Sequence, residues 1–142
     1  TIGSSGCGPT SLAMVVVGLT GDTTVNPKVV ADWSYANGHR VEGIGTAWSL
    51  FPAGARKWDI RCEELSVSAS QISQKLREGK VVITSMGKGH FTNNGHFIVL
   101  RGITGSGKIL VNDPNSREKS NQEWSVSIIV SEAKGAWAFS KP

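Results

Sequence analysis

The chain contains two cysteines, and one of them has the setting of a catalytic nucleophile. Cys7 stands in the sequence Gly-Cys-Gly-Pro at residues 6–9, just before the apolar run 12–17, which is followed by Gly18. A proline near the first helical position and a glycine just past the last predict a helix, although three valines favour a strand. Cys7 then lies at the helix N-terminus, where the helix dipole and free N–H groups stabilise a thiolate and can hold an oxyanion. The alternative is a small apolar residue that begins a core helix.

The second cysteine, Cys62, lies in an alternating stretch, residues 59–63, that predicts a strand. We expect it to be a packed or half-exposed thiol without a catalytic role. Two cysteines form no disulfide framework in a domain of this size, although one bridge between them is possible.

Three histidines could serve as the base for Cys7. His39 follows a glycine that ends a predicted helix, and we expect it at the surface. His90 lies within a loop rich in glycine and asparagine, residues 87–95. His96 is the first residue of an apolar strand, and a strand end holds a side chain more firmly than a loop does. His96 is therefore the predicted base, and a structural histidine satisfied by its neighbours is the alternative.

A catalytic imidazole needs a group that orients its second ring nitrogen. The predicted strands 96–103 and 108–112 are joined by a Gly-rich turn, which indicates a hairpin. Across that hairpin His96 lies roughly opposite residues 112–114, so Asp113 is presented at the same end of the sheet. A cysteine, a histidine and an aspartate in this arrangement are typical of a cysteine hydrolase. A metal site made of the same three residues is the alternative, but no Cys-x-x-Cys or His-x-x-x-His spacing supports it.

The three segments that carry these residues resemble the C39-like peptidases of the papain-like superfamily. They are GCGPTSLAM at residues 6–14, GHFIVL at 95–100 and VNDP at 111–114. The resemblance spans the whole chain, including the regions around Trp33 and Trp48 and the segment 124–137. It implies a papain-like α+β fold, with a central N-terminal helix packed on an antiparallel sheet.

The resemblance also implies a role for each residue of the site: Cys7 as nucleophile, His96 as general base and acid, and Asp113 as orienter. One departure concerns the glutamine that papain-like enzymes usually carry shortly before the cysteine, because residues 1–6 contain none. The backbone N–H of Cys7 is the first candidate oxyanion donor in its place. The further candidates are Thr1, Ser4 and Ser5.

The walls of the substrate cleft are predicted from the loop that leads into His96. Because residues 87–95 are rich in glycine and asparagine, we expect this loop to border the cleft. His90 or Phe91 would then lie near the substrate path. Trp48, from the predicted helical region, is a third candidate for the cleft.

The order of the predicted elements favours an α+β fold, because helices come first and mostly antiparallel strands follow. Predicted helices cover residues 26–37, 45–55 and 68–78, and predicted strands cover 60–65, 81–86, 96–103, 108–112 and 137–139. The segment 124–133 is ambiguous between helix and strand.

The length of 142 residues predicts a single domain, 1–142, which we expect to be cut from a longer chain.

The net charge is +4, and the basic residues are scattered along the chain instead of clustered, which argues against nucleic acid as a partner. No apolar stretch is long enough for membrane insertion. We expect no cofactor and no metal, and neither composition nor spacing predicts an oligomeric state. A pI near 9.3 suits ordinary solubility as well as the acidic setting of a bacterial cell wall. The resemblance implies the substrate, because C39-like peptidases are often bacterial or phage-borne and several accompany cell-wall-degrading domains. We therefore expect a bacterial or phage endopeptidase or amidase that acts on peptidoglycan stem peptides and is secreted or wall-associated. The alternatives are a leader-peptide processing peptidase and a non-catalytic peptide- or wall-binding module of the same fold.

Overall fold

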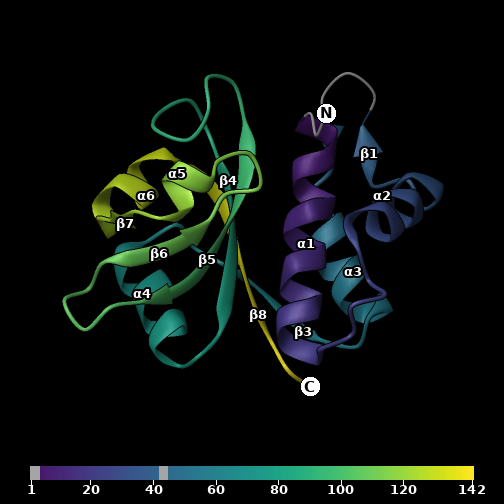
Figure 1. Ribbon diagram of the computed structural model, residues 1–142, viewed down its shortest axis with the longest axis horizontal. Helices are drawn as coiled ribbons and strands as arrows, with labels where there is room; N and C mark the ends of the chain where they lie inside the picture. The colour runs from purple at the N-terminus through teal and green to yellow at the C-terminus, as the bar shows by residue number, and fades with distance from the viewer. Residues whose placement is uncertain (1–3, 42–44) are drawn as a thin grey trace.

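The computed structural model describes residues 4–41 and 45–142, and it is built around a six-stranded antiparallel sheet with helices on both faces (Figure 1). On one face lie α1 (Ser4–Thr20), α2 (Pro27–Ala36) and α3 (Leu50–Lys57). On the other lie α4 (Ala69–Arg77), α5 (Arg117–Ser120) and α6 (Val126–Glu132). The predicted α+β class and the packing of the N-terminal helix on an antiparallel sheet are confirmed.

The strands follow the order β3-β8-β4-β5-β6-β7, and every neighbouring pair is antiparallel. Their bounds are β3 Arg61–Leu65, β4 Val81–Met86, β5 His96–Ile103, β6 Ile109–Asn112, β7 Glu123–Trp124 and β8 Ala133–Ser140. A separate two-stranded sheet pairs β1 (Arg40–Val41) with β2 (Gly45–Thr46). The last strand of the chain, β8, lies in the interior of the sheet between β3 and β4, so residues near the C-terminus complete the core.

The central strands are buried on both faces, which explains why their sequences are continuous apolar runs instead of alternating ones. Ile83 on β4 and Val99 on β5 belong to the hydrophobic cluster that includes α1. Their strand neighbours Val82 and Leu100 belong to a second cluster, with residues of α4 and α6. The sheet therefore separates two hydrophobic layers. Only side chains in the layer on the α1 face can approach α1.

Helix α1 is buried on most of its circumference, as the apolar run 12–17 predicts, with Leu12 and Val16 almost fully covered. It begins at Ser4, earlier than the sequence indicates, so Pro9 is the sixth helical residue and not one of the first. Pro9 has no N–H to donate to the carbonyl one turn earlier, which helices tolerate near their N-terminus far better than in their middle. It also continues past Gly18 to Thr20. Cys7 is consequently the fourth residue of the helix.

Two other predicted elements differ from the structure. The expected helix 45–55 is wrong at its start, because residues 45–46 form β2 and the helix begins only at Leu50. Pro52 does not break it, since a proline in the first turn gives up an N–H that has no helical partner there. The ambiguous segment 124–133 contains the end of β7, the short helix α6 and the start of β8.

Candidate active site

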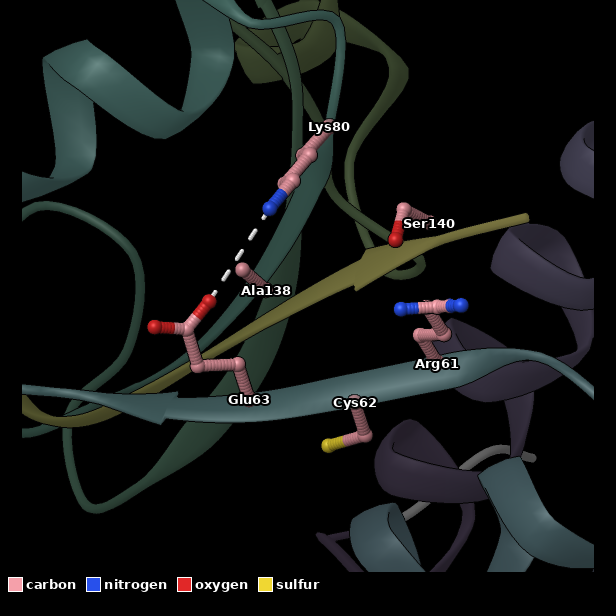
Figure 2. Close-up of a pocket in the computed structure, with 6 residues that line it drawn as sticks. All are labelled: Arg61, Cys62, Glu63, Lys80, Ala138 and Ser140. Carbon is pink, nitrogen blue, oxygen red and sulfur yellow. Dashed lines mark ion pairs between the residues drawn. The ribbon is translucent and has the colours of Figure 1, made fainter. Parts of the chain in front are cut away.

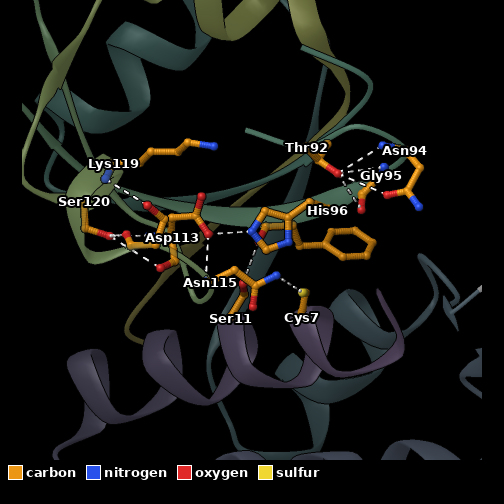
Figure 3. A network of polar contacts seen from close by, with 12 residues as sticks. Cys7, Ser11, Thr92, Asn94, Gly95, His96, Asp113, Asn115, Lys119 and Ser120 are labelled. Carbon is orange, nitrogen blue, oxygen red and sulfur yellow. Dashed lines mark hydrogen bonds and ion pairs between the residues drawn. The ribbon is translucent and has the colours of Figure 1, made fainter. Parts of the chain in front are cut away.

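Cys7 lies in the first part of α1, on the side that packs against the sheet, and is only 1% exposed. One turn further along the helix, the Ser11 hydroxyl donates a hydrogen bond of 3.4 Å to the backbone carbonyl of Phe97. Phe97 directly follows His96 on β5, so this bond ties the start of α1 to the strand that carries the imidazole. Figure 3 shows Cys7 and Ser11 on the helix below the His96 ring.

His96 and Asp113 form a buried pair in which Nε2 of the ring lies 2.6 Å from Oδ1 of the carboxylate. Because a carboxylate can only accept, Nε2 carries the proton and Nδ1 is left as the second, outward-acting nitrogen. Asp113 is itself fixed, since its backbone N–H donates to the Ser120 hydroxyl oxygen at 2.8 Å. The contact that the hairpin prediction places between His96 and Asp113 is present.

The strand register explains how Asp113 reaches the ring. Val99 pairs with Asn112, so the ladder between β5 and β6 ends three residues before the level of His96. The chain then turns within four residues, and Asp113 forms an isolated antiparallel bridge with Ser116. Asp113 therefore lies at the end of β6 and reaches diagonally along the sheet edge to the imidazole.

Opposing influences set the charge of the His96 ring. Burial, the largest, lowers its pKa, but hydrogen bonding to Asp113 and the interaction with Cys7 outweigh it and raise the pKa of His96 from 6.5 to about 9. An imidazolium is therefore the expected form at neutral pH. A positive charge beside a thiol favours the thiolate, which is the nucleophilic form of cysteine.

Two buried atoms of this pair, Nδ1 of His96 and Oδ2 of Asp113, make no hydrogen bond within the described part of the chain. Cys7 lies on the helix below the ring (Figure 3), and its interaction with the ring contributes to the raised pKa of His96. Catalytic hydrogen bonds are often long or poorly aligned until substrate binds. Nδ1 is thus available to exchange a proton with the sulfur or with a leaving group.

Asn115 is a residue of the site that the sequence analysis did not identify. Its side-chain Nδ2 donates to Sγ of Cys7 at 3.4 Å, across 108 positions of sequence (Figure 3). Its backbone N–H donates to Oδ1 of Asp113 at 2.8 Å, an Asx turn that fixes the asparagine relative to the aspartate. The Asp-Pro-Asn sequence is typical of such a turn, but its approach to Cys7 depends on the packing of α1 against the sheet.

The predicted oxyanion donors stay predictions. Thr1 lies outside the described residues, and Ser4 and Ser5 are described only as backbone in the first turn of α1. The first four N–H groups of a helix have no partner within it. Because Cys7 is the fourth residue of a helix that begins at Ser4, its backbone N–H is the last of these four and stays a candidate donor.

The prediction that His90 or Phe91 lies near the substrate path is wrong. Phe91 is buried at 5% exposure in the cluster on the α4 and α6 face, and its ring packs against Trp124 with centroids 4.5 Å apart. His90 forms an ion pair with Glu132 at the end of α6 and also contacts Trp124. Cys7 belongs to the cluster on the opposite face of the sheet. The loop is held by tertiary contacts with the end of the chain, which no local pattern indicates.

Trp48 remains a candidate for the cleft. It is 43% exposed and packs edge-to-face on Trp137 with centroids 5.1 Å apart. Trp137 belongs to the same hydrophobic cluster as Cys7, so Trp48 lies over the face of the sheet that carries α1.

A cavity of about 430 Å³ adjoins the site between α1 and the turn after β6. Its lining residues are Met14, Asn112, Asp113, Pro114, Asn115, Ser116, Arg117 and Ser120. Asp113 and Asn115 thus face a space large enough for part of a substrate, and Asn115 links this space to Cys7 through its side-chain amide.

A second cavity, of about 340 Å³, has the other cysteine, Cys62, among its lining residues (Figure 2). Burial, together with the negative charges of Glu64 and Glu63, raises the pKa of Cys62 to about 12 against the opposing charge of Arg56. This thiol is protonated at neutral pH and is a poor nucleophile. In the described part of the chain no disulfide joins Cys62 to Cys7, so the possible bridge between them is absent. The cavity at Cys62 therefore lacks the chemistry for acyl transfer.

Within residues 4–41 and 45–142, no group of three or more His, Cys, Asp or Glu side chains is placed to bind one metal ion. No helix in the described part of the chain has both the length and the apolar character needed to cross a bilayer.

Comparisons with known proteins concern the family and the fold of the chain. The model of a family described as "Peptidase_C39 like family" matches residues 2–141. Among solved structures, the peptidase domain of Streptococcus ComA, a bi-functional ABC transporter involved in a quorum-sensing pathway, is similar in fold. The TM-score is 0.74 at 17% sequence identity, and the match covers 100% of this chain and 96% of that domain. A search of curated proteins found no match.

Proposed function

Because the chain belongs to the Peptidase_C39-like family, we propose that it hydrolyses peptide or amide bonds with Cys7 as its nucleophile. The observation that carries this proposal is the chain of contacts from Asp113 through His96 to Cys7. Asp113 binds Nε2 of the ring at 2.6 Å, and Cys7 helps to raise the pKa of the same ring. These interactions support the roles of nucleophile for Cys7, base for His96 and orienter for Asp113 in acyl transfer to water.

The proposed reaction has two halves. The Cys7 thiolate attacks the carbonyl carbon of the scissile bond, and as the tetrahedral intermediate collapses the C–N bond breaks and the His96 imidazolium gives its proton to the leaving amine. A thioester now joins the substrate's acyl group to Sγ. Water then attacks this thioester, His96 accepts the water proton, and the S–C bond breaks to release a carboxylic acid.

Asp113 keeps the ring in the tautomer that this reaction needs. Because Nε2–H is held by the carboxylate, Nδ1 is the nitrogen that donates and accepts the travelling proton. The negative charge of the Asp113 carboxylate also stabilises the His96 imidazolium, which is present before acylation and forms again during deacylation.

The substrate we propose is the stem peptide of peptidoglycan, with the protein secreted or associated with the wall. A net charge of +4 and a pI near 9.3 support this choice, because bacterial walls carry excess negative charge that attracts a basic protein. A second candidate is a peptidase that processes proteins or leader peptides. The similarity in fold to the peptidase domain of ComA favours it.

The proposal is tested by incubating purified sacculi with the wild-type chain and with the Cys7→Ala and Cys62→Ser variants. We expect wild type and Cys62→Ser to release soluble fragments with new amino groups, identified by mass spectrometry, and Cys7→Ala to release none. Cleavage of unfolded polypeptides but not of sacculi would favour the second candidate. Binding to sacculi without cleavage by any of the three would favour a non-catalytic module and refute hydrolysis.

A further inference from the structure

We propose that the side-chain amide of Asn115 is an oxyanion-hole donor of this site, supplying a hydrogen bond to the carbonyl oxygen of the substrate as it becomes negatively charged. The inference rests on the proposed function, because it assigns a catalytic residue to that same reaction. It also addresses the departure seen in the sequence, where no glutamine precedes Cys7 within residues 1–6.

Asn115 is placed where such a donor must be. Its Nδ2 lies 3.4 Å from Sγ of Cys7, the atom that forms the new bond to the substrate's carbonyl carbon. The carbonyl oxygen is one bond beyond that carbon. During the attack it therefore lies within about 3 Å of donor groups that contact Sγ, such as Nδ2 of Asn115. Asn115 also lines the cavity of about 430 Å³ and is exposed, so an entering substrate can contact it.

The backbone of Asn115 is fixed independently of its side chain. Its N–H donates to Oδ1 of Asp113 at 2.8 Å, the same oxygen that binds His96. The helix-capping hydroxyl of Ser116 follows, accepting from the N–H of Lys119 at 3.0 Å. These bonds are made by the backbone and by neighbouring residues, so replacing the Asn115 side chain leaves the turn intact and removes only the amide. Pre-positioned donors of this kind need little reorganisation during the reaction.

The movement of charge during acylation gives the amide its catalytic effect. In the attacking thiolate of the proposed reaction the negative charge is on Sγ, to which the Nδ2–H of Asn115 donates. When the S–C bond forms, the sulfur becomes a neutral thioether and the charge passes to the carbonyl oxygen, so the donor's partner changes from Sγ to that oxygen. Catalysis gains only the difference between these two hydrogen bonds. Hydrogen bonds to a concentrated charge on oxygen are stronger than those to sulfur, which makes the difference favourable.

The test compares two reactions of Cys7 that differ in whether an oxyanion forms. Acetylation by p-nitrophenyl acetate passes through a tetrahedral oxyanion as the thiolate displaces p-nitrophenolate. Alkylation by iodoacetamide displaces iodide from a saturated carbon and forms no oxyanion. Both rates are measured in a Cys62→Ser parent, with Asn115→Leu as the near-isosteric variant that has no donor. Asn121→Leu, another exposed asparagine six positions further along, is the control.

We expect Asn115→Leu to lower the acetylation rate by about 100-fold, as loss of a single oxyanion donor does elsewhere, while alkylation stays near the parent rate. Asn121→Leu should change neither rate. Equal losses in both reactions would show that Asn115 acts on the thiolate alone, and no loss in either would show that it is idle; each result overturns the inference. Should the parent's Cys7 alkylate no faster than a thiol of the unfolded chain, the proposed function fails first and the inference fails with it.

Discussion

Replacing Asp113 with asparagine should lower the pKa of His96, so that a large share of the rings becomes neutral at physiological pH. In the wild type, the hydrogen bond to Asp113 and the interaction with Cys7 raise the pKa of His96 to about 9 against the effect of burial. An opposite charge at hydrogen-bond distance accounts for about 1–3 pH units of such a change. The asparagine keeps the volume and can still accept from Nε2–H, but burial remains without the charge that offsets it. We therefore expect the pKa of His96 in Asp113→Asn to fall by about two pH units.

The same difference appears in stability. Because the folded-state pKa of His96 lies above the ordinary value of 6.5, protonation of the ring stabilises the folded chain fully below pH 6.5. That contribution declines as the pH rises from 6.5 to about 9 and is absent above it. A rise from 6.5 to about 9 corresponds to about 3 kcal/mol of unfolding free energy at the low-pH end. Asp113→Asn should flatten this part of the stability profile.

The assay is a proton–carbon NMR titration of the three histidine rings from pH 5 to pH 10, with the His96 signal assigned by its loss in His96→Gln. His39 and His90 serve as internal references in every spectrum. Urea denaturation over the same pH range supplies the stability profile. The reasoning is refuted if wild-type His96 titrates at or below 6.5, or if its midpoint is unchanged in Asp113→Asn.

Three further predictions concern single positions. Cys7→Ser should abolish hydrolysis while circular dichroism shows an intact fold, whereas Cys62→Ser should keep nearly full activity; the reverse result would mean that the wrong cysteine has been assigned. Phe91→Ala should lower the unfolding free energy by about 3–4 kcal/mol in urea, because its ring is buried against Trp124; a loss under about 1 kcal/mol would contradict that packing. Gly54→Ala should destabilise by about 1–3 kcal/mol because the added methyl would overlap the Leu12 side chain. The matched change Gly18→Ala, into open space on α1, should be neutral or stabilising by about 1 kcal/mol, and equal effects of the two would refute the account.

The parts of the fold that the sequence predicts well are those decided by neighbours along the chain. The helix 68–78 is confirmed as α4, where the Ser68 side chain accepts from the N–H of Gln71, and its apolar positions face the core. The hairpin of β5 and β6 follows from two apolar runs and a Gly-rich turn. Such signals need only a few consecutive residues, because caps and tight turns are satisfied locally.

The parts that it misses depend on contacts between distant segments. Residues 45–46 pair with residues 40–41 instead of joining the next helix. The glycines and asparagines of loop 87–95 predict a border of the cleft, yet Phe91 is buried by Trp124, and His90 is held by Glu132 more than forty residues away. The amide of Asn115 reaches Cys7 only after α1 has packed across the sheet edge. Local patterns carry no information about such approaches, since they follow from how the layers pack.

The measurement that tests the central claim most directly is the pH dependence of Cys7 alkylation in the Cys62→Ser background, with and without His96→Gln. If His96 is an imidazolium that holds the Cys7 sulfur as a thiolate, alkylation by iodoacetamide should remain fast below pH 7. Removal of the ring in His96→Gln should then confine fast alkylation to alkaline pH. Superimposable profiles for the two proteins, both following an ordinary thiol with a pKa of about 8.5, would contradict a catalytic Cys7–His96 pair.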